Sequence, residues 1–412
     1  MRSLKKNIIS TILLCMSSLL NAQSLDYYLK TAAENNPGLK AKYVEFEAAM
    51  QLVTQVNALP DPKLSFGYFV TPVETRVGPQ QAKFGLSQMF PWFGTLSAKG
   101  EMATLLAEAK YQVFLNAKNE LYYEVKAAWY PLYVLNETLQ LQEENKEILY
   151  TFKQLALTGF ENGKGSMVDV IRVDIMIENA ETDIKLLREE EMPLLAKFNA
   201  LLNRADTMHV FIPDSLPVHK VEKGYRKDSL LKAHPILEAL NLKIKSAEAQ
   251  ETVARKMGLP SFGVGIDYVL VGERIDMNVP GNGKNVVMPM ITMSLPVFRG
   301  KYNAAVKEAQ FTQESIISSK QNVENNLIYS YDLNWFRLDK ALRLMDLYSE
   351  QIKKTEQAIG LLLATYRNSR KDFEEVLRMQ QQLLKYQIAK AIALKDYYTA
   401  LANLNYLTAK SE

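Results

Sequence analysis

The sequence predicts a mainly α-helical protein with an internal two-fold repeat, in which each half carries two short β-strands and one long helical hairpin. The first observation is that the order of segments in the first half returns about 200 residues later. The second is that two stretches of about 60 residues each contain scarcely a helix breaker. The third is that each half contains two segments in which apolar and small or polar residues alternate. The matching breaks of the two halves are Asn36-Pro37 and His234-Pro235, Leu59-Pro60 and Leu259-Pro260, Phe90-Pro91 and Leu295-Pro296, and residues 157–163 and 363–369.

Residues 1–22 have the composition of a secretory signal peptide. A basic start with Arg2, Lys5 and Lys6 precedes an apolar stretch and a small-residue exit. The alternative is a buried first helix. Cleavage would remove three of the 49 Lys and Arg residues and none of the 46 Asp and Glu residues, so the mature chain would carry 46 of each sign. This balance disfavours nucleic acid as a partner, because such proteins carry a basic stripe.

Cys15 is the only cysteine, and it lies inside the predicted signal. The preceding Leu13 and Leu14 do not favour lipidation, although lipidation of Cys15 is an alternative. The mature chain would then have no disulfide and no thiolate metal site. No run of 18 apolar residues follows the signal, so no transmembrane helix is predicted.

The first repeat is predicted over residues 23–205. It begins with two helices and continues into strands at about 63–71 and 82–91, with a loop over Pro72 to Pro79 between them. A helical hairpin follows over about 95–203.

Residues 206–225 are predicted to be a linker, and the second repeat spans 226–412. Its strands are expected at about 261–271 and 285–296, and its hairpin at about 301–409. A helix of about 60 residues is roughly 90 Å long, too long for an ordinary globular domain of this size. The small and apolar residues along one side of each helix predict coiled-coil-like packing between the members of each hairpin.

The strand segments have the length and pattern of strands that cross a membrane. They are about 9–11 residues long, and Phe262, Val264, Ile266 and Tyr268 alternate with small or polar residues. The alternative is a pair of ordinary hairpins packed on a soluble core. Four strands are too few to close a barrel, and an open sheet in lipid would leave unpaired edges. A membrane sheet therefore requires several chains to share one barrel.

Taken together, this order of hairpins and strands resembles the TolC family of outer-membrane channel proteins over essentially the whole mature chain. The resemblance implies a homotrimer in which each protomer gives four transmembrane strands to a 12-stranded β-barrel and two hairpins to a periplasmic α-barrel. It also implies a periplasmic adaptor protein and an inner-membrane proton-driven pump of the RND type as partners, with outer-membrane lipid around the barrel. Residues 59–62, 74–80 and 87–94 are most similar to the heavy-metal efflux subgroup.

In that family the hairpin turns form the periplasmic end that contacts the adaptor. The matching residues are Phe160, Gly163 and Ser166 in the first turn and Tyr366 and Ser369 in the second. Ser369 replaces the family's glycine, so the two turns are expected to be unequal contacts. The alternative is that both are simple helix-hairpin turns.

The family's acidic constriction of the pore matches Glu375 and the position of Arg378, and the first hairpin repeats the arrangement with Asp169 and Arg172. A ring of carboxylates at a narrow point would favour cations. The alternative is an ordinary ion pair between residues three apart on a helix. Our hypothesis is that Glu375 and Arg378 link neighbouring hairpins in the closed state.

The sequence predicts no metal site, no cofactor and no catalytic residue. It contains no Gly-rich phosphate loop, no His-centred metal motif and no convincing nucleophile arrangement. The soft thioethers of Met288, Met290 and Met293 suit copper or silver, but Met293 is expected on the opposite face of its strand, which favours packing. The predicted function is the exit duct of an efflux system for heavy-metal cations. The alternatives are drugs or secreted polypeptide as cargo, or a periplasmic coiled-coil adaptor.

Overall fold

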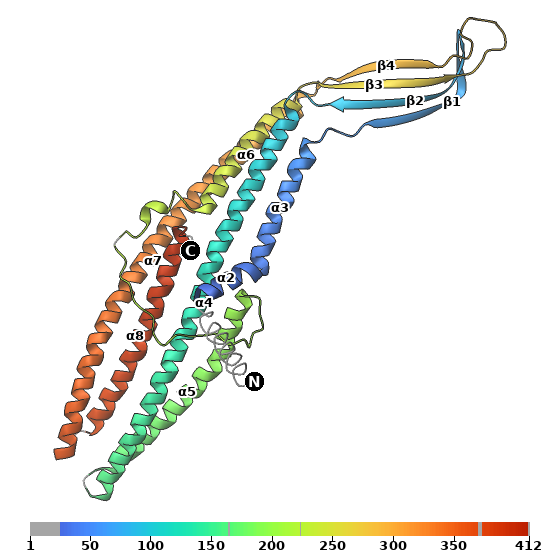
Figure 1. Cartoon of the computed structure of the whole chain (residues 1–412). Helices are drawn as coiled ribbons and strands as arrows, with labels where there is room; N and C mark the ends of the chain where they lie inside the picture. The colour runs from blue at the N-terminus through green and yellow to red at the C-terminus, as the bar shows by residue number, and fades with distance from the viewer. Residues whose placement is uncertain (1–24, 164, 223, 370–372, 411–412) are drawn as a thin grey trace, which may run out of the picture. The chain divides into compact units, whose positions relative to one another are not determined.

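The structure, a computed structural model, describes residues 25–163, 165–222, 224–369 and 373–410. In these residues the chain is mainly helical with one small antiparallel sheet, which confirms the predicted fold class (Figure 1). The predicted signal peptide, including Cys15, lies outside the described residues. The elements are α2 (Leu25–Asn35), α3 (Pro37–Asn57), β1 (Lys63–Thr75), β2 (Gly78–Phe90), α4 (Thr95–Glu161), α5 (Met167–Leu201), a short 3-10 turn (Lys227–Ser229), α6 (Pro235–Met257), β3 (Ser261–Val271), β4 (Val286–Ser294), α7 (Arg299–Ser369) and α8 (Phe373–Leu407).

The chain divides into two compact units. The first, the hairpin unit, contains the described residues among 25–41, 115–235 and 324–410, and it holds α5, α8, the linker and the larger parts of α4 and α7. The second, the sheet unit, contains residues 42–114 and 236–323, and it holds all four strands with the helix segments next to them. In the described residues, no helix has a stretch both long and apolar enough to cross a bilayer.

The four strands form one sheet in the order β1-β2-β3-β4, with every neighbouring pair antiparallel. The bounds of β3 match the prediction. However, β1 and β2 are longer than predicted, and the expected loop over 72–79 is wrong, because both strands continue to a tight turn at Arg76 and Val77. Pro72 lies inside β1, which is an edge strand, and edge strands tolerate a residue that has no N–H to donate. The pairing of β1 with β2 is irregular between Tyr68 and Val73, on either side of this proline.

The linker packs against the hairpin unit and is anchored by tyrosine hydroxyl groups. The Tyr28 hydroxyl accepts a hydrogen bond from the Phe211 N–H at 2.8 Å, and the Tyr331 hydroxyl donates to the Tyr225 carbonyl at 2.8 Å. Tyr28 and Tyr331 are both almost completely buried. These long-range bonds satisfy backbone groups of an irregular segment, so the linker is a fixed part of the unit.

Candidate functional sites

The turn of the first hairpin is built from a glycine and a hydroxyl cap. Gly163 has a φ of 65°, in the left-handed region that glycine adopts without strain, and its N–H donates to the Phe160 carbonyl at 2.9 Å. Ser166 is the N-cap of α5, and its hydroxyl accepts a hydrogen bond from the Val168 N–H at 3.1 Å. The Phe160 ring is 44% exposed. The turn therefore leaves an apolar side chain partly exposed on the surface of the chain.

The corresponding position in the second hairpin is different. Tyr366 matches Phe160 in the repeat, but it is only 5% exposed and lies 4.8 Å, centroid to centroid, from the ring of Phe373. A Cβ on Gly159 would come within 3.0 Å of the Tyr366 hydroxyl, so the two hairpins approach closely there. Ser369 ends α7, and its side chain lies outside the described residues. Of the two matched aromatic residues, only Phe160 is placed to contact a partner through its ring.

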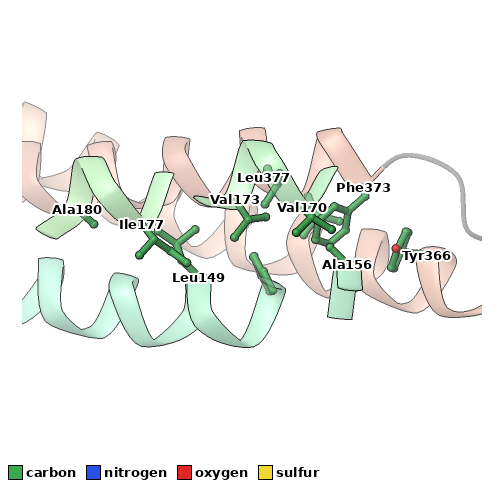
Figure 2. Close-up of a cluster of buried hydrophobic side chains, with 11 residues drawn as sticks. Leu149, Ala156, Val170, Val173, Ile177, Ala180, Tyr366, Phe373 and Leu377 are labelled. Atoms are coloured by element: carbon green, nitrogen blue, oxygen red, sulfur yellow. The ribbon is translucent and has the colours of Figure 1, made fainter. Parts of the chain in front are cut away.

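The two hairpins are joined near their ends by one hydrophobic cluster with contributions from α4, α5, α7 and α8 (Figure 2). Phe373 stands among the labelled side chains close to Val170, and Tyr366 approaches them from α7. Burial of these apolar groups is the main force that holds the hairpin ends together. The buried members are Leu149, Phe152, Ala156, Val170, Val173, Ile177, Ala180, Tyr366, Phe373, Val376 and Leu377.

A polar bridge crosses between the hairpins beside this cluster. The Arg172 guanidinium on α5 donates to the Glu374 carboxylate on α8, with 2.7 Å between Nη1 and Oε2. Its distance to the predicted partner Asp169 is longer, 3.9 Å. The sequence analysis missed Glu374, because the two bridged residues are 202 positions apart and no local spacing connects them. The structure therefore brings one of the four predicted constriction residues into a contact between hairpins.

The other predicted pair, Glu375 and Arg378, forms an ion pair along one helix. The Arg378 Nε lies 3.1 Å from the Glu375 carboxylate, three residues earlier on α8. Deeper between the hairpins, the Gln380 side-chain amide donates to Asn145 on α4 at 3.1 Å, and both side chains are buried. The link of Glu375 and Arg378 to a neighbouring hairpin stays a prediction.

The two faces of the sheet differ in chemistry. The register places most of the large apolar residues of the four strands on one face, where most of them are exposed. The opposite face carries mainly small and polar residues, together with three methionines and the valines Val269 and Val286. The apolar face includes Leu64, Phe66, Tyr68, Phe84, Leu86, Val264, Ile266, Tyr268, Val287, Ile291 and Met293; the polar face includes Ser65, Gly67, Lys83, Gly85, Ser87, Met89, Gly263, Gly265, Asp267, Met288, Met290 and Thr292.

The polar face has a charged pair and a group of thioethers. Asp267 on β3 is 2% exposed and forms an ion pair with Lys83 on β2, so its charge is compensated. Met288 and Met290 lie on this face, opposite to Met293 as predicted. The structure adds Met89, from the first half of the chain, to the same face; its sulfur accepts a hydrogen bond from the Thr292 hydroxyl at 3.6 Å.

The histidines do not gather into a site. His209 and His219 are exposed, whereas His234 is 2% exposed and lies against the Tyr406 ring with 5.7 Å between centroids. Burial lowers the pKa of His234 from its ordinary value of 6.5 to about 4, so it is neutral at physiological pH. Within the part of the chain that the structure describes, no group of three or more His, Cys, Asp or Glu side chains is arranged to hold a metal ion.

The family model described as outer membrane efflux protein matches residues 28–191 and 228–410, one segment in each half of the repeat. The chain belongs to this family. It is an outer-membrane efflux channel protein of the TolC type, as its resemblance implied, and its place in the cell is the outer membrane. Its relatives are channel proteins and not enzymes.

Solved structures show the same fold at low sequence identity. The outer membrane protein VceC of Vibrio cholerae is 14% identical, with a TM-score of 0.75 over 93% of this chain and 95% of that chain. CusC is 14% identical, with a TM-score of 0.77 over 93% and 91%. The MtrE outer membrane channel of Neisseria gonorrhoeae, solved in its open state, is 18% identical, with a TM-score of 0.70 over 92% and 88%. Among curated proteins, no significant match was found.

Proposed function

We propose that three copies of this chain form one exit duct across the periplasm and the outer membrane, and that the duct carries heavy-metal cations. The observation that carries this proposal is the sheet. It has four strands, two unpaired edges at β1 and β4, and a continuous exposed apolar face. A sheet of this kind is stable in lipid only when its edges are paired, and three copies supply the twelve strands of a closed barrel. The apolar face would then contact lipid and the polar face would line the lumen.

The partners in this proposal are a periplasmic adaptor protein and an inner-membrane pump of the RND type. Adaptor contact is assigned to the hairpin ends, at Phe160, Gly163 and Ser166 in the first turn and at Ser369 in the second. The exposed Phe160 ring, together with Met167 and Val168 at the exposed start of α5, gives the first turn an apolar surface that a partner helix could cover. The buried Tyr366 supports the second turn from inside the cluster.

The closed end of the duct is assigned to the charged residues just above these turns. Asp169, Arg172, Glu375 and Arg378 lie within the first two or three turns of α5 and α8, where the two hairpins meet. Arg172 and Glu374 tie the hairpins of one protomer together. A link of Glu375 and Arg378 across to the next protomer is the further part of this proposal.

Heavy-metal cargo is supported by two features. The segments 59–62, 74–80 and 87–94 resemble the heavy-metal subgroup. In addition, the polar face carries the thioethers of Met89, Met288 and Met290, which are soft ligands of the kind that Cu(I) and Ag(I) prefer. Scattered thioethers give weak contacts, and weak contacts suit a channel because a tightly held ion would not leave.

The test is growth of a deletion strain on copper, silver, zinc, cobalt and detergent-like drugs. We expect sensitivity to at least one metal, restored by the wild-type chain. Complementation by a variant with Met89, Met288 and Met290 all replaced by leucine should restore growth on zinc but less fully on silver, with Met293→Leu on the opposite face as the control. Sensitivity to drugs alone would reject the metal assignment and favour drugs as cargo.

A further inference from the structure

The sheet unit contains a cavity where its strands end and its helices begin. Its volume is about 530 Å³. All four strand–helix junctions contribute to its lining: Pro60 precedes β1, Trp92 follows β2, Leu259 precedes β3 and Leu295 follows β4. The cavity is therefore a product of the duplicated strand pairs and the helices next to them.

The charge of this cavity has one sign. Lys99 on α4, Lys256 on α6 and Lys301 on α7 line it, and no aspartate or glutamate does. Among the described residues, none of these three lysines forms an ion pair with a carboxylate. Lys256 donates to the Phe93 carbonyl at 3.3 Å, and the Lys301 ammonium lies 4.8 Å from the centroid of the Tyr302 ring. Three uncompensated ammonium groups at one cavity create a positive potential that attracts an anion.

The helices add to this potential. Both α4 and α7 begin at the cavity, which Thr95 and Tyr302 of their first turns line, and the N-terminus of a helix carries a partial positive charge. The remainder of the lining is apolar and aromatic, with Leu259, Leu295 and Trp92 among its members. A small inorganic anion has no apolar surface to bury against such a lining, whereas an anionic group attached to an apolar molecule does.

The geometry points to a binding site for the phosphate group of an anionic phospholipid. This assignment rests on the proposed function, because strands that cross the outer membrane and helices that stand in the periplasm place their junctions at the periplasmic surface of the membrane. Lysine and tryptophan are common at that depth, where the charged group reaches the headgroups and the ring lies at the interface. The cavity gives this general preference a defined place, with three cations around the phosphate and apolar walls for the glycerol and the start of the acyl chains.

The test is native mass spectrometry of the full chain in detergent, with phosphatidylglycerol or phosphatidylcholine of the same acyl chains added. We expect the wild type to retain phosphatidylglycerol in preference to phosphatidylcholine. A variant carrying Lys99→Gln, Lys256→Gln and Lys301→Gln should bind phosphatidylglycerol at least about tenfold more weakly, because each lysine contributes to the attraction of an anionic lipid. The control carries Lys110→Gln, Lys245→Gln and Lys307→Gln, the same charge change on the same three helices outside the cavity.

Equal retention of the two lipids by the wild type, or equal loss in the cavity variant and the control, would overturn the assignment. Full displacement of phosphatidylglycerol by millimolar inorganic phosphate would show a site for free anions and would reject the lipid. The same spectra report the number of chains. A trimer that conducts ions but retains no phosphatidylglycerol rejects the lipid site alone, whereas the absence of a trimer rejects the proposed function.

Discussion

Replacing Arg172 by alanine should make the duct open more often. The Arg172 guanidinium connects α5 to Glu374 on α8, and this is the shortest charged contact that the structure shows between the two hairpins of one protomer. If the closed state requires the hairpin ends to stay together, loss of this bridge favours the open state. The hydrophobic cluster beneath it is unchanged, so the protein should still fold and assemble.

The expected size follows from the exposure of the pair. The Arg172 and Glu374 side chains are 42% and 69% exposed, so solvent screens their attraction and the pair contributes about 0.5 kcal/mol, within the 0.2–1 kcal/mol of exposed ion pairs. Three protomers would contribute about 1.5 kcal/mol. Since about 1.4 kcal/mol corresponds to a tenfold change in an equilibrium constant, the ratio of open to closed channels should rise by roughly tenfold.

The assay is single-channel conductance in planar bilayers at low and high salt. Arg343→Ala is the control, because it removes an equivalent ion pair with Asp339 within α7 and changes the charge equally. The effect of Arg172→Ala should shrink as ionic strength rises, and the swap of Arg172→Glu with Glu374→Arg should restore the closed state. Equal open probabilities for Arg172→Ala and Arg343→Ala at low salt would refute the reasoning.

Three other predictions concern the same unit. Glu375→Ala or Arg378→Ala should raise conductance, and unchanged conductance for both variants would reject a link between neighbouring hairpins through this pair. Phe373→Ala should destabilise the hairpin ends by about 3–5 kcal/mol because the ring is buried in the cluster, whereas Phe160→Ala should change stability by less than about 0.5 kcal/mol. Amide hydrogen exchange at the two hairpin ends measures both effects. Similar protection in the two variants would contradict the placement of these rings. The contribution of neutral His234 to the free energy of unfolding should be fully present above about pH 6.5 and fall by about 3 kcal/mol as the pH drops to about 4, because the unfolded chain binds a proton at His234 that the folded chain excludes. Melting temperatures of the wild type and of His234→Phe across this pH range test this prediction. Parallel curves for the two proteins would count against it.

The sequence predicted the order of the elements because the repeat and the alternation are local patterns. Strand β3 was placed at its observed bounds, since its two-residue period is uninterrupted. The extension of β1 through Pro72 was missed because proline usually ends a strand, and only the sheet topology shows that β1 is an edge strand that tolerates it. Pro289 in β4, the opposite edge strand, is tolerated for the same reason.

The candidate sites were predictable only where the chemistry is local. The tight turn at Gly163 and the N-cap at Ser166 depend on a few adjacent residues. The different exposure of Phe160 and Tyr366 could not be predicted, because it depends on other helices, which bury one ring and leave the other exposed. Glu374 was missed for the same reason, since its partner lies on the other hairpin.

We propose that the four-stranded sheet of one chain is a third of a shared barrel. The most direct measurement is the mass of the detergent-extracted protein by native mass spectrometry, combined with cross-linking between single cysteines introduced into β1 and β4, whose free edges must meet. We expect a mass of three chains and cross-links only between β1 of one chain and β4 of another. A mass of one or two chains, or a β1–β4 cross-link within a single chain, would contradict it.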